Sequence, residues 1–289
     1  MDTRTDTRLD LLLRFLRFPI VLLGLLYVVL GYLYVAGYFF RASMAKGPLQ
    51  GVVASLLSAV LMLGTYAVVA HVVERRKASE LALPRMGREF GLGLLLGAGL
   101  YTACILVLIA LGLYRIEGFN TWQVVLPGMA IVIATGVYEE LLFRGGVFRL
   151  AEEWFGSWAA LAISSLLFGF IHLQNPGSTL QGAVFISIEA GVLLAAAYML
   201  TRRLWLSIGF HMAWNFTQGT IFSGSVSGNG VSQGVLKATL DGPELLTGGS
   251  FGLEASLPAF VLCTSTGVIL VIMAVRRGHV VPPMWKRRA

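Results

Sequence analysis

The chain has 289 residues, of which 56% are hydrophobic and only 13% are charged, and its mean hydropathy is +0.77. A soluble globular domain carries about 25% charged residues, so this composition excludes a soluble domain and predicts an integral membrane protein. The net charge of +7 is typical of a membrane protein whose basic residues gather on one side, with some attraction to anionic lipid headgroups. Because no basic patch is interleaved with aromatic residues, we expect no nucleic-acid partner.

Eight apolar runs approach the length of about 20 residues that a helix needs to cross the hydrocarbon core of a bilayer. They lie at about residues 18–40, 49–73, 90–114, 122–143, 157–174, 180–200, 204–222 and 256–275. We therefore predict an all-α polytopic membrane protein with about eight transmembrane helices. The segments between the runs leave no room for a soluble domain, and no repeat of fixed period is present. We expect a single membrane domain over residues 1–289.

The basic residues predict the orientation, because cytoplasmic loops accumulate Lys and Arg. With the N-terminus in the cytoplasm, only Arg41, Lys46, Arg115 and Lys237 fall on the outer side, and the other 18 of the 22 basic residues fall on the inner side. The inner ones are Arg4, Arg8, Arg14, Arg17, Arg75, Arg76, Lys77, Arg85, Arg88, Arg144, Arg149, Arg202, Arg203, Arg276, Arg277, Lys286, Arg287 and Arg288. This distribution favours cytoplasmic N- and C-termini and a location in the cell membrane.

Three other features say less about chemistry. The N-terminal "MDTRTDTRLD" is too acidic for the first part of a signal peptide, so we interpret the first apolar run as an uncleaved span. Residues 223–254, on the outer side, are rich in Gly and Ser and are typical of turns or of a flexible lid. Cys104 and Cys263 lie inside apolar runs and do not indicate a redox compartment.

The fourth run ends in an unusual way, with the charged stretch "VYEELLFRGG" at residues 137–146. An ionisable side chain near the bilayer centre costs about 2.5–3.5 kcal/mol, so such a residue is a functional candidate. Glu140 and Arg144 are four residues apart, which is the favourable order for a helical ion pair. Glu139 is rotated by about 100° from Glu140 and is free to face elsewhere. The alternative is that the helix ends at Val137 and that the charges are solvated at the membrane surface.

Two later runs also carry polar residues. In "FGFIH", Phe168 and His172 stand one helical turn apart, and this histidine could equally be a hydrogen-bonding residue between packed helices. In "HMAWN", His211 and Asn215 are again four residues apart, so both side chains point into the same space. The second pair favours a shared polar cavity.

Helix geometry predicts that these groups meet. In an antiparallel hairpin, Glu139 and His172 lie at equal depth if the chain turns between Phe155 and Gly156, inside "EEWFGSW". At a rise of 1.5 Å per residue, His211 reaches the same level if the hairpin extends roughly 12 Å into the cytoplasm. We therefore expect a cavity that faces the cytoplasm.

The chemistry of this group of side chains suits amide hydrolysis. A carboxylate and a histidine can deprotonate a water molecule, and a second histidine and an amide can stabilise a developing oxyanion. Glu, His and His are also a credible zinc ligand set, but the compact HExxH helix of the zincins is absent. Activation of water by Glu139 is the first interpretation, a zinc-bound water is the second, and no cofactor is firmly indicated.

The residues in this order resemble those of a known family. "EELLFR" (Glu139 to Arg144), "FGFIH" and "HMAWN" resemble the EExxxR, FxxxH and HxxxN motifs of the CAAX prenyl protease and bacteriocin-processing (CPBP) intramembrane proteases, formerly called Abi. The resemblance covers about residues 122–222, which would be the protease core. It implies an endopeptidase that cuts membrane-anchored or lipidated substrates. In this sequence Glu139 would activate water with His172, Glu140 and Arg144 would support the site, and His211 with Asn215 would hold the oxyanion.

Glu189 departs from that pattern, because no motif of the family requires an acid in its span. A proton-coupled transporter or channel, with Glu139, Glu189, His172 and His211 as a relay, is the alternative function. An inactive scaffold with the same fold is a third possibility. Transporters usually contain repeats or paired broken helices, and the sequence shows neither. The favoured interpretation is an intramembrane endopeptidase.

Overall fold

The computed structural model describes residues 8–44 and 47–287. Arg4, Lys46 and Arg288, which contributed to the charge distribution, lie outside these residues. The described chain is nearly all helical, which confirms the predicted all-α class. The long helices are α2 (Pro19–Met44), α3 (Pro48–Val72), α4 (Met86–Ala110), α5 (Val125–Glu140), α6 (Arg149–Ile171) and α11 (Leu257–Arg276). The shorter ones are α1 (Arg8–Leu16), α7 (Leu180–Ile186), α8 (Val192–Thr201), α9 (Trp205–Asn215) and α10 (Glu244–Thr247).

Six helical stretches of the described chain are long and apolar enough to cross a membrane. Two of the predicted runs, 122–143 and 157–174, fall within one of these stretches, Trp122–Gln174. The run predicted at 204–222 is α9, which continues as a π-helical segment to Ile221. The protein is therefore a helical membrane protein, and the number of eight separate spans stays a prediction.

The stretch Trp122–Gln174 is divided by a sharp turn at Gly156. This glycine has φ = +81°, a conformation that side chains with a Cβ rarely adopt. A Cβ here would also lie 2.8 Å from the carbonyl oxygen of Val281, in the C-terminal segment that packs on the turn. The turn is at the position that the depth of Glu139 and His172 predicted, so residues 122–155 and 157–171 form a helical hairpin.

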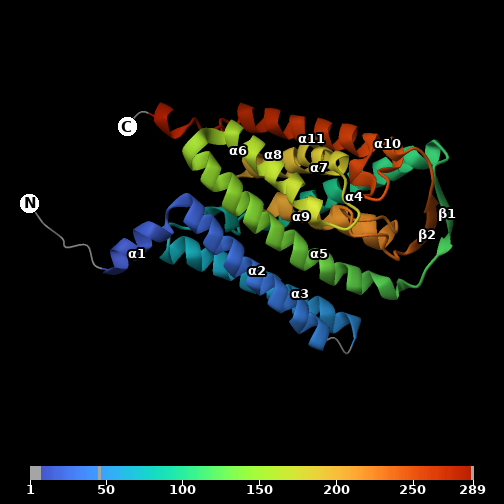
Figure 1. Cartoon of the computed structure of the whole chain (residues 1–289), viewed down its shortest axis with the longest axis horizontal. Coiled ribbons are helices and arrows are strands. Elements are labelled where there is room, and N and C mark those ends of the chain that lie inside the picture. Colours follow the sequence, from blue (N-terminus) through green and yellow to red (C-terminus); the bar gives the residue numbers. More distant parts are fainter. Residues whose placement is uncertain (1–7, 45–46, 288–289) are drawn as a thin grey trace, which may run out of the picture.

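The structure also contains a small sheet that the sequence did not predict. Strands β1 (Tyr114–Phe119) and β2 (Leu236–Leu240) pair in antiparallel fashion, with an irregularity between Ile116 and Gly118. They lie at the end of the molecule away from the N- and C-terminal ends of the chain (Figure 1). The sheet joins the connection before α5 to the loop after α9, both of which border the candidate site.

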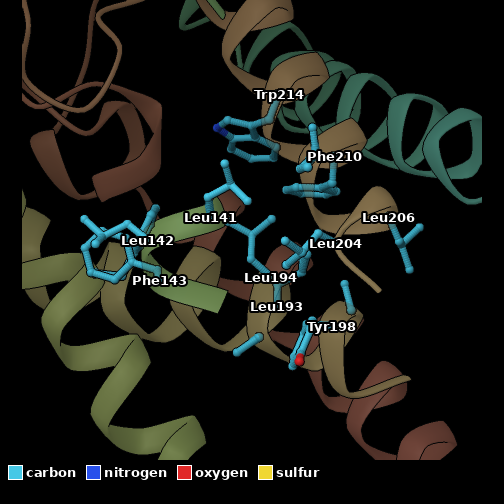
Figure 2. Close-up of a cluster of buried hydrophobic side chains, with 14 of the residues drawn as sticks. Leu141, Leu142, Phe143, Leu193, Leu194, Tyr198, Leu204, Leu206, Phe210 and Trp214 are labelled. Carbon is cyan, nitrogen blue, oxygen red and sulfur yellow. The ribbon is translucent and has the colours of Figure 1, made fainter. Parts of the chain in front are cut away.

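The interior of the bundle is built around α8, with η3 (Leu141–Phe148) and α9 beside it (Figure 2). The three consecutive alanines at 195–197 of α8 are buried, and small residues of this kind allow helix backbones to approach closely. By contrast, α2 and α3 leave large apolar side chains exposed, including Ile20, Tyr32 and Leu49. In a membrane protein such exposed faces are expected to contact lipid.

Helix α4 lies along α9 at very short range. Its Gly93 and Gly97 face the backbone of α9, and a Cβ on Gly97 would come 2.3 Å from the carbonyl oxygen of Phe210. Any larger residue would push the two helices apart. The position of α9, which carries His211 and Asn215, therefore depends on these two glycines.

Candidate active site

A cavity of about 950 Å³ lies between α2, α5, the end of α6 and the end of α9. Four of the predicted site residues line it, and they are Glu139, His172, His211 and Asn215. The three motifs, which are far apart in the sequence, thus meet in one space. The other two predicted residues, Glu140 and Arg144, are fully buried behind the wall of the cavity.

Glu140 joins two of the motifs. Arg144 donates a hydrogen bond from Nη1 to Oε1 of Glu140 over 2.9 Å, which is the predicted ion pair. The same oxygen lies 2.9 Å from Nδ1 of His211. A carboxylate accepts hydrogen bonds, so His211 donates from Nδ1 in this contact. Glu140 therefore orients the His211 ring, a contact that the sequence did not predict.

Glu139 has a different environment from its neighbour. Its side chain is 24% exposed, whereas that of Glu140 is 0% exposed. Its Oε2 lies 3.7 Å from Nε2 of His211 and has no hydrogen-bond partner among the described residues. Glu139 is thus the partly exposed carboxylate that lines the cavity, with its Oε2 buried beside His211.

His172 follows the last residue of α6 in a short 3-10 turn, η4 (His172–Gln174). Its Nδ1 lies 2.7 Å from the backbone carbonyl oxygen of Phe168. Because a carbonyl oxygen only accepts, Nδ1 carries the proton, and in the neutral ring Nε2 keeps a lone pair. That lone pair can accept a hydrogen bond from water.

Phe168 is the common neighbour of the site residues. The guanidinium carbon of Arg144 lies 4.5 Å from the centre of the Phe168 ring, which is a cation–π contact. The rings of His172 and His211 lie 5.0 and 5.9 Å from the same ring, in edge-on arrangements. Phe168 therefore fixes the positions of one cation and two histidines.

Three π-helical segments border the site, although π-helix accounts for well under 1% of residues in proteins. η3 (Leu141–Phe148) follows Glu140, η5 (Ser187–Gly191) contains Glu189, and η6 (Phe216–Ile221) follows Asn215. Such segments interrupt the regular backbone hydrogen bonds of a helix and are frequent at functional sites. Here Arg144 takes up one carbonyl, because its Nη2 donates to the oxygen of Gly191 over 3.3 Å.

Glu189 does not line the large cavity. It borders a much smaller pocket of about 10 Å³, together with Glu254 and Cys263. This pocket shares His211, Asn215 and Ser227 with the cavity. Glu254 accepts hydrogen bonds from the backbone N–H of Ser227 over 2.6 Å and from Nε2 of Gln218 over 3.2 Å. Burial raises the pKa of the Glu254 carboxyl above its usual range.

Some residues that line the cavity were not predicted as site residues from the sequence. Tyr34 of α2 lines the cavity and stacks on Tyr138, with ring centres 4.8 Å apart. Ser227 lines it from the loop that Glu254 holds in place. A tyrosine in an apolar run and a serine in a Gly-rich loop are both common, so neither stood out.

The side chains do not form an evident metal site. Within residues 8–44 and 47–287, no three His, Cys, Asp or Glu side chains converge as a bound metal ion would require. Glu139 and His211 are close to each other, but a third ligand at matching distance is missing from this part of the chain. We therefore derive no chemical step through a metal ion.

The mouth of the cavity lies at the end of the molecule where α5 begins and where α6 and α9 end. The residues around it include Thr121, Gln123, Gln174, Asn229, Ser232 and Gln233. This is the end that carries β1 and β2, opposite to the end with both termini and most basic residues (Figure 1). The sequence predicted both a cytoplasmic basic end and a cavity that faces the cytoplasm. In this structure the mouth of the cavity is at the end opposite to the basic residues, so the two expectations cannot both be correct.

A second hollow adjoins the cavity on the lipid side. It is an apolar groove of about 570 Å³ between the first half of α2 and the end of α6. Leu142, Phe143 and Ile171 line both the groove and the cavity. The apolar groove and the cavity are therefore adjacent, with these three side chains at their common border.

The family comparison matches the segment that builds this site. Residues 120–217 match the family model described as type II CAAX prenyl endopeptidase Rce1-like. No curated protein and no solved structure matches the chain. The matched residues begin just before α5 and end just after α9, so they include all three motifs. The chain therefore contains, at residues 120–217, an Rce1-like domain of the CPBP family of CAAX-type intramembrane proteases.

Proposed function

We propose that this protein is an intramembrane endopeptidase of the cell membrane in which Glu139 activates a water molecule for attack on a peptide bond. The observation that carries the proposal is the position of Glu139 in the cavity. Its partly exposed carboxylate lines the cavity beside His211 inside a membrane bundle, and Glu140 holds that histidine in place. The Rce1-like match of the same residues supports the reaction class.

The proposed first step uses a water molecule between Glu139 and His172. Glu139 takes a proton from the water, and the lone pair on Nε2 of His172 accepts the other hydrogen as a hydrogen bond. The oxygen then bonds to the carbonyl carbon of the substrate, and the electron pair of the C=O bond moves to the oxygen. Glu139 is suited to this role because it lines the cavity and is only partly buried.

The second step releases the products. The oxyanion is stabilised by the amide of Asn215 and, when its ring is doubly protonated, by Nε2–H of His211. The C–N bond breaks as the oxyanion collapses, and Glu139 returns its proton to the leaving amine. Arg144 does not line the cavity, so its role is to hold Glu140, and Glu140 in turn holds His211.

The proposed substrate is a peptide or protein anchored in the bilayer by a lipid or an apolar segment. The groove between α2 and α6 would receive the anchor, because it is apolar and borders the cavity at Leu142, Phe143 and Ile171. The alternative function, a proton relay in a transporter, is not favoured. It needs Glu189 together with Glu139, and Glu189 lies outside the cavity that Glu139 lines.

A panel of peptides tests this proposal. Each peptide is supplied to the purified protein in liposomes with a lipid anchor, with an apolar anchor or without an anchor, and products are identified by mass spectrometry. We expect cleavage of anchored peptides at one bond near the anchor and none by Glu139→Gln. The proposal fails if no anchored peptide is cut faster than in the Glu139→Gln sample, or if unanchored peptides are cut equally well.

Metal analysis of the same samples separates the two ways of activating water. Activation by Glu139 predicts cleavage that survives dialysis against a strong chelator. A stoichiometric metal in the wild-type protein, lost together with activity in His172→Ala and His211→Ala, would instead favour a zinc-bound water.

A further inference from the structure

The mouth of the cavity and most of the basic residues lie at opposite ends of the bundle. This separation indicates from which side of the membrane a substrate reaches the cavity. The cavity opens between the first residues of α5, the turn after α6 and the loop after α9. These segments lie beside the β1–β2 sheet, far from the N- and C-terminal ends of the chain (Figure 1). Gln174, Asn229 and Gln233, on the rim, are exposed.

The rim of the cavity is polar but not basic. No Lys or Arg is among the described residues that line the cavity, and Glu139 is its one carboxylate. Within the described chain, only Arg41, Arg115 and Lys237 supply positive charge to this end of the molecule. By the rule that Lys and Arg are retained in the cytoplasm, this end has the composition of a non-cytoplasmic surface.

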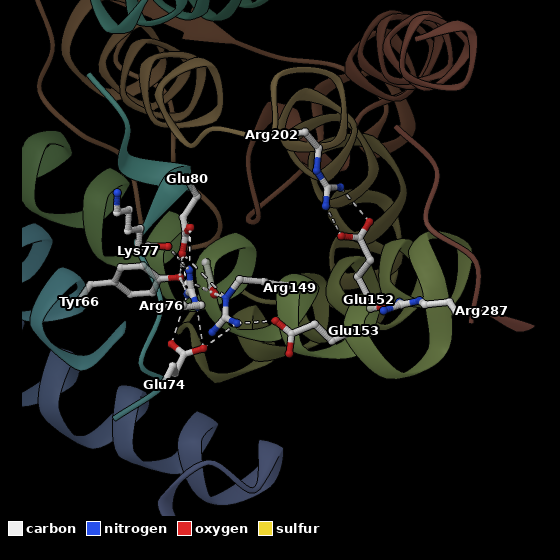
Figure 3. Close-up of polar contacts among 11 residues, drawn as sticks. Tyr66, Glu74, Arg76, Lys77, Glu80, Arg149, Glu152, Glu153, Arg202 and Arg287 are labelled. Carbon is white, nitrogen blue, oxygen red and sulfur yellow. Dashed lines mark hydrogen bonds and ion pairs between the residues drawn. The ribbon is translucent and has the colours of Figure 1, made fainter. Parts of the chain in front are cut away.

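The opposite end is basic and is closed by ion pairs (Figure 3). Arg149 of α6 pairs with Glu74, beyond α3, over 2.8 Å and with Glu153 over 2.7 Å. Arg76 pairs with Glu80 over 2.8 Å in the connection between α3 and α4. Entry of a peptide from this end would have to break these contacts.

A second group of contacts closes the same end between other elements. Arg202, after α8, pairs with Glu152 of α6, and Arg203 pairs with Glu89 of α4. Arg287 near the C-terminus donates to the backbone oxygen of Glu152 over 3.0 Å. The helices are therefore tied together by ion pairs at the basic end.

We propose that the cavity opens to the non-cytoplasmic side of the membrane and that the scissile bond of the substrate is delivered from that side. The part of this proposal that concerns the substrate rests on the proposed function. The apolar groove lies on the basic side of Glu139 along the hairpin, at Leu142 and Val147, whereas the polar rim lies on the other side. The substrate class is thus a peptide with an apolar anchor in the bilayer and a hydrophilic segment on the non-cytoplasmic face.

Thiol labelling in intact cells tests the direction of the cavity. Ser232→Cys places a reporter at the rim, and Ser79→Cys places one in the exposed connection at the basic end. The native Cys104 and Cys263 are buried, so the wild-type chain is the unlabelled control. We expect a membrane-impermeant maleimide to label Ser232→Cys in intact cells and Ser79→Cys only after the membrane is opened.

The opposite pattern, or labelling of Ser79→Cys in intact cells, would overturn the proposal. Gln233→Cys, which is more exposed, serves as the second rim reporter if Ser232→Cys does not react even in opened membranes. The same reporters in a Glu139→Gln chain should give the same labelling. The orientation is therefore tested separately from the catalytic role, and a failure of either one does not decide the other.

Discussion

Glu139 and Glu140 are adjacent in the sequence but occupy different environments. Neighbours on a helix are rotated by about 100°, so the two side chains were predicted to face in different directions. The spacing of four residues predicted the pairing of Glu140 with Arg144. The structure contains that pair at 2.9 Å. The contact between Glu140 and His211 could not be predicted, because it depends on how α5 packs against α9. The catalytic roles of these residues stay predictions.

The two glutamates should respond differently to loss of charge. Glu140→Gln leaves the fully buried Arg144 without its carboxylate, and breaking a buried ion pair in this way costs about 3–5 kcal/mol. Glu139→Gln removes a partly exposed carboxylate and should change the melting temperature much less. Thermal unfolding of the purified variants in one detergent measures both effects.

A double variant checks the cause of that loss. Glu140→Gln with Arg144→Met removes both charges, so it should recover part of the stability that Glu140→Gln alone loses. If the double variant is as unstable as the sum of the two single variants, the ion pair is not the reason.

At the scale of elements, the position of the hairpin turn and the meeting of the three motifs were predicted from helix geometry, because the rise per residue is the same in every α-helix. The turn was predicted between Phe155 and Gly156, and Gly156 is where the backbone leaves the helix. The π-helical segments were not predicted, since no residue pattern distinguishes them from α-helix. The β1–β2 sheet was also missed, because its strands are short and separated by more than 100 residues in the sequence.

The contact between α4 and α9 gives a matched pair of variants. Gly97→Ala places a methyl group 2.3 Å from the carbonyl oxygen of Phe210, so α9 must move, with a cost of about 1–3 kcal/mol. Gly99→Ala meets no atom within 4 Å and should be neutral or stabilising by up to about 1 kcal/mol. Because α9 carries His211 and Asn215, we expect Gly97→Ala alone to lower the cleavage rate.

Melting temperatures and initial rates of the two variants measure these effects. Equal rates and stabilities for Gly97→Ala and Gly99→Ala would show that the close approach of the helices does not position the site.

The ion-pair group at the basic end predicts a pH dependence of stability. Burial by itself would raise the pKa of Glu80, but hydrogen bonds from Arg76 and Tyr66 outweigh burial and lower that pKa below 4.5. The stabilisation that this carboxylate provides is therefore complete above pH 4.5 and is lost as the pH falls through the lower pKa of the folded state. Melting temperatures between pH 7 and pH 3 should fall less steeply for Glu80→Gln than for the wild type.

Glu117→Gln is the control for this measurement, because Glu117 is an exposed residue of β1. It should follow the wild-type curve. An unchanged slope in Glu80→Gln would show that this carboxylate does not carry the acid sensitivity.

At the scale of the whole molecule, composition and hydropathy were enough to predict an all-α membrane protein, since the chain has 13% charged residues whereas a soluble domain typically has about 25%. The number of spans was less predictable, because a hairpin with a turn at one glycine is continuous in hydropathy. The side of the membrane to which the cavity opens could not be derived from depth alone. Equal depth of Glu139 and His172 holds for entry from either end, and only the tertiary structure places the mouth opposite to the basic residues.

The most direct test of the catalytic role of Glu139 is the initial rate of cleavage of one anchored peptide by the wild type, Glu139→Gln and Glu189→Gln in liposomes, with melting temperatures measured on the same preparations. Glu189 is the matched control, because it is a carboxylate inside the bundle that does not line the cavity. We predict a fall of at least about 100-fold for Glu139→Gln at unchanged stability, and of less than about tenfold for Glu189→Gln. Cleavage by folded Glu139→Gln at close to the wild-type rate would contradict it.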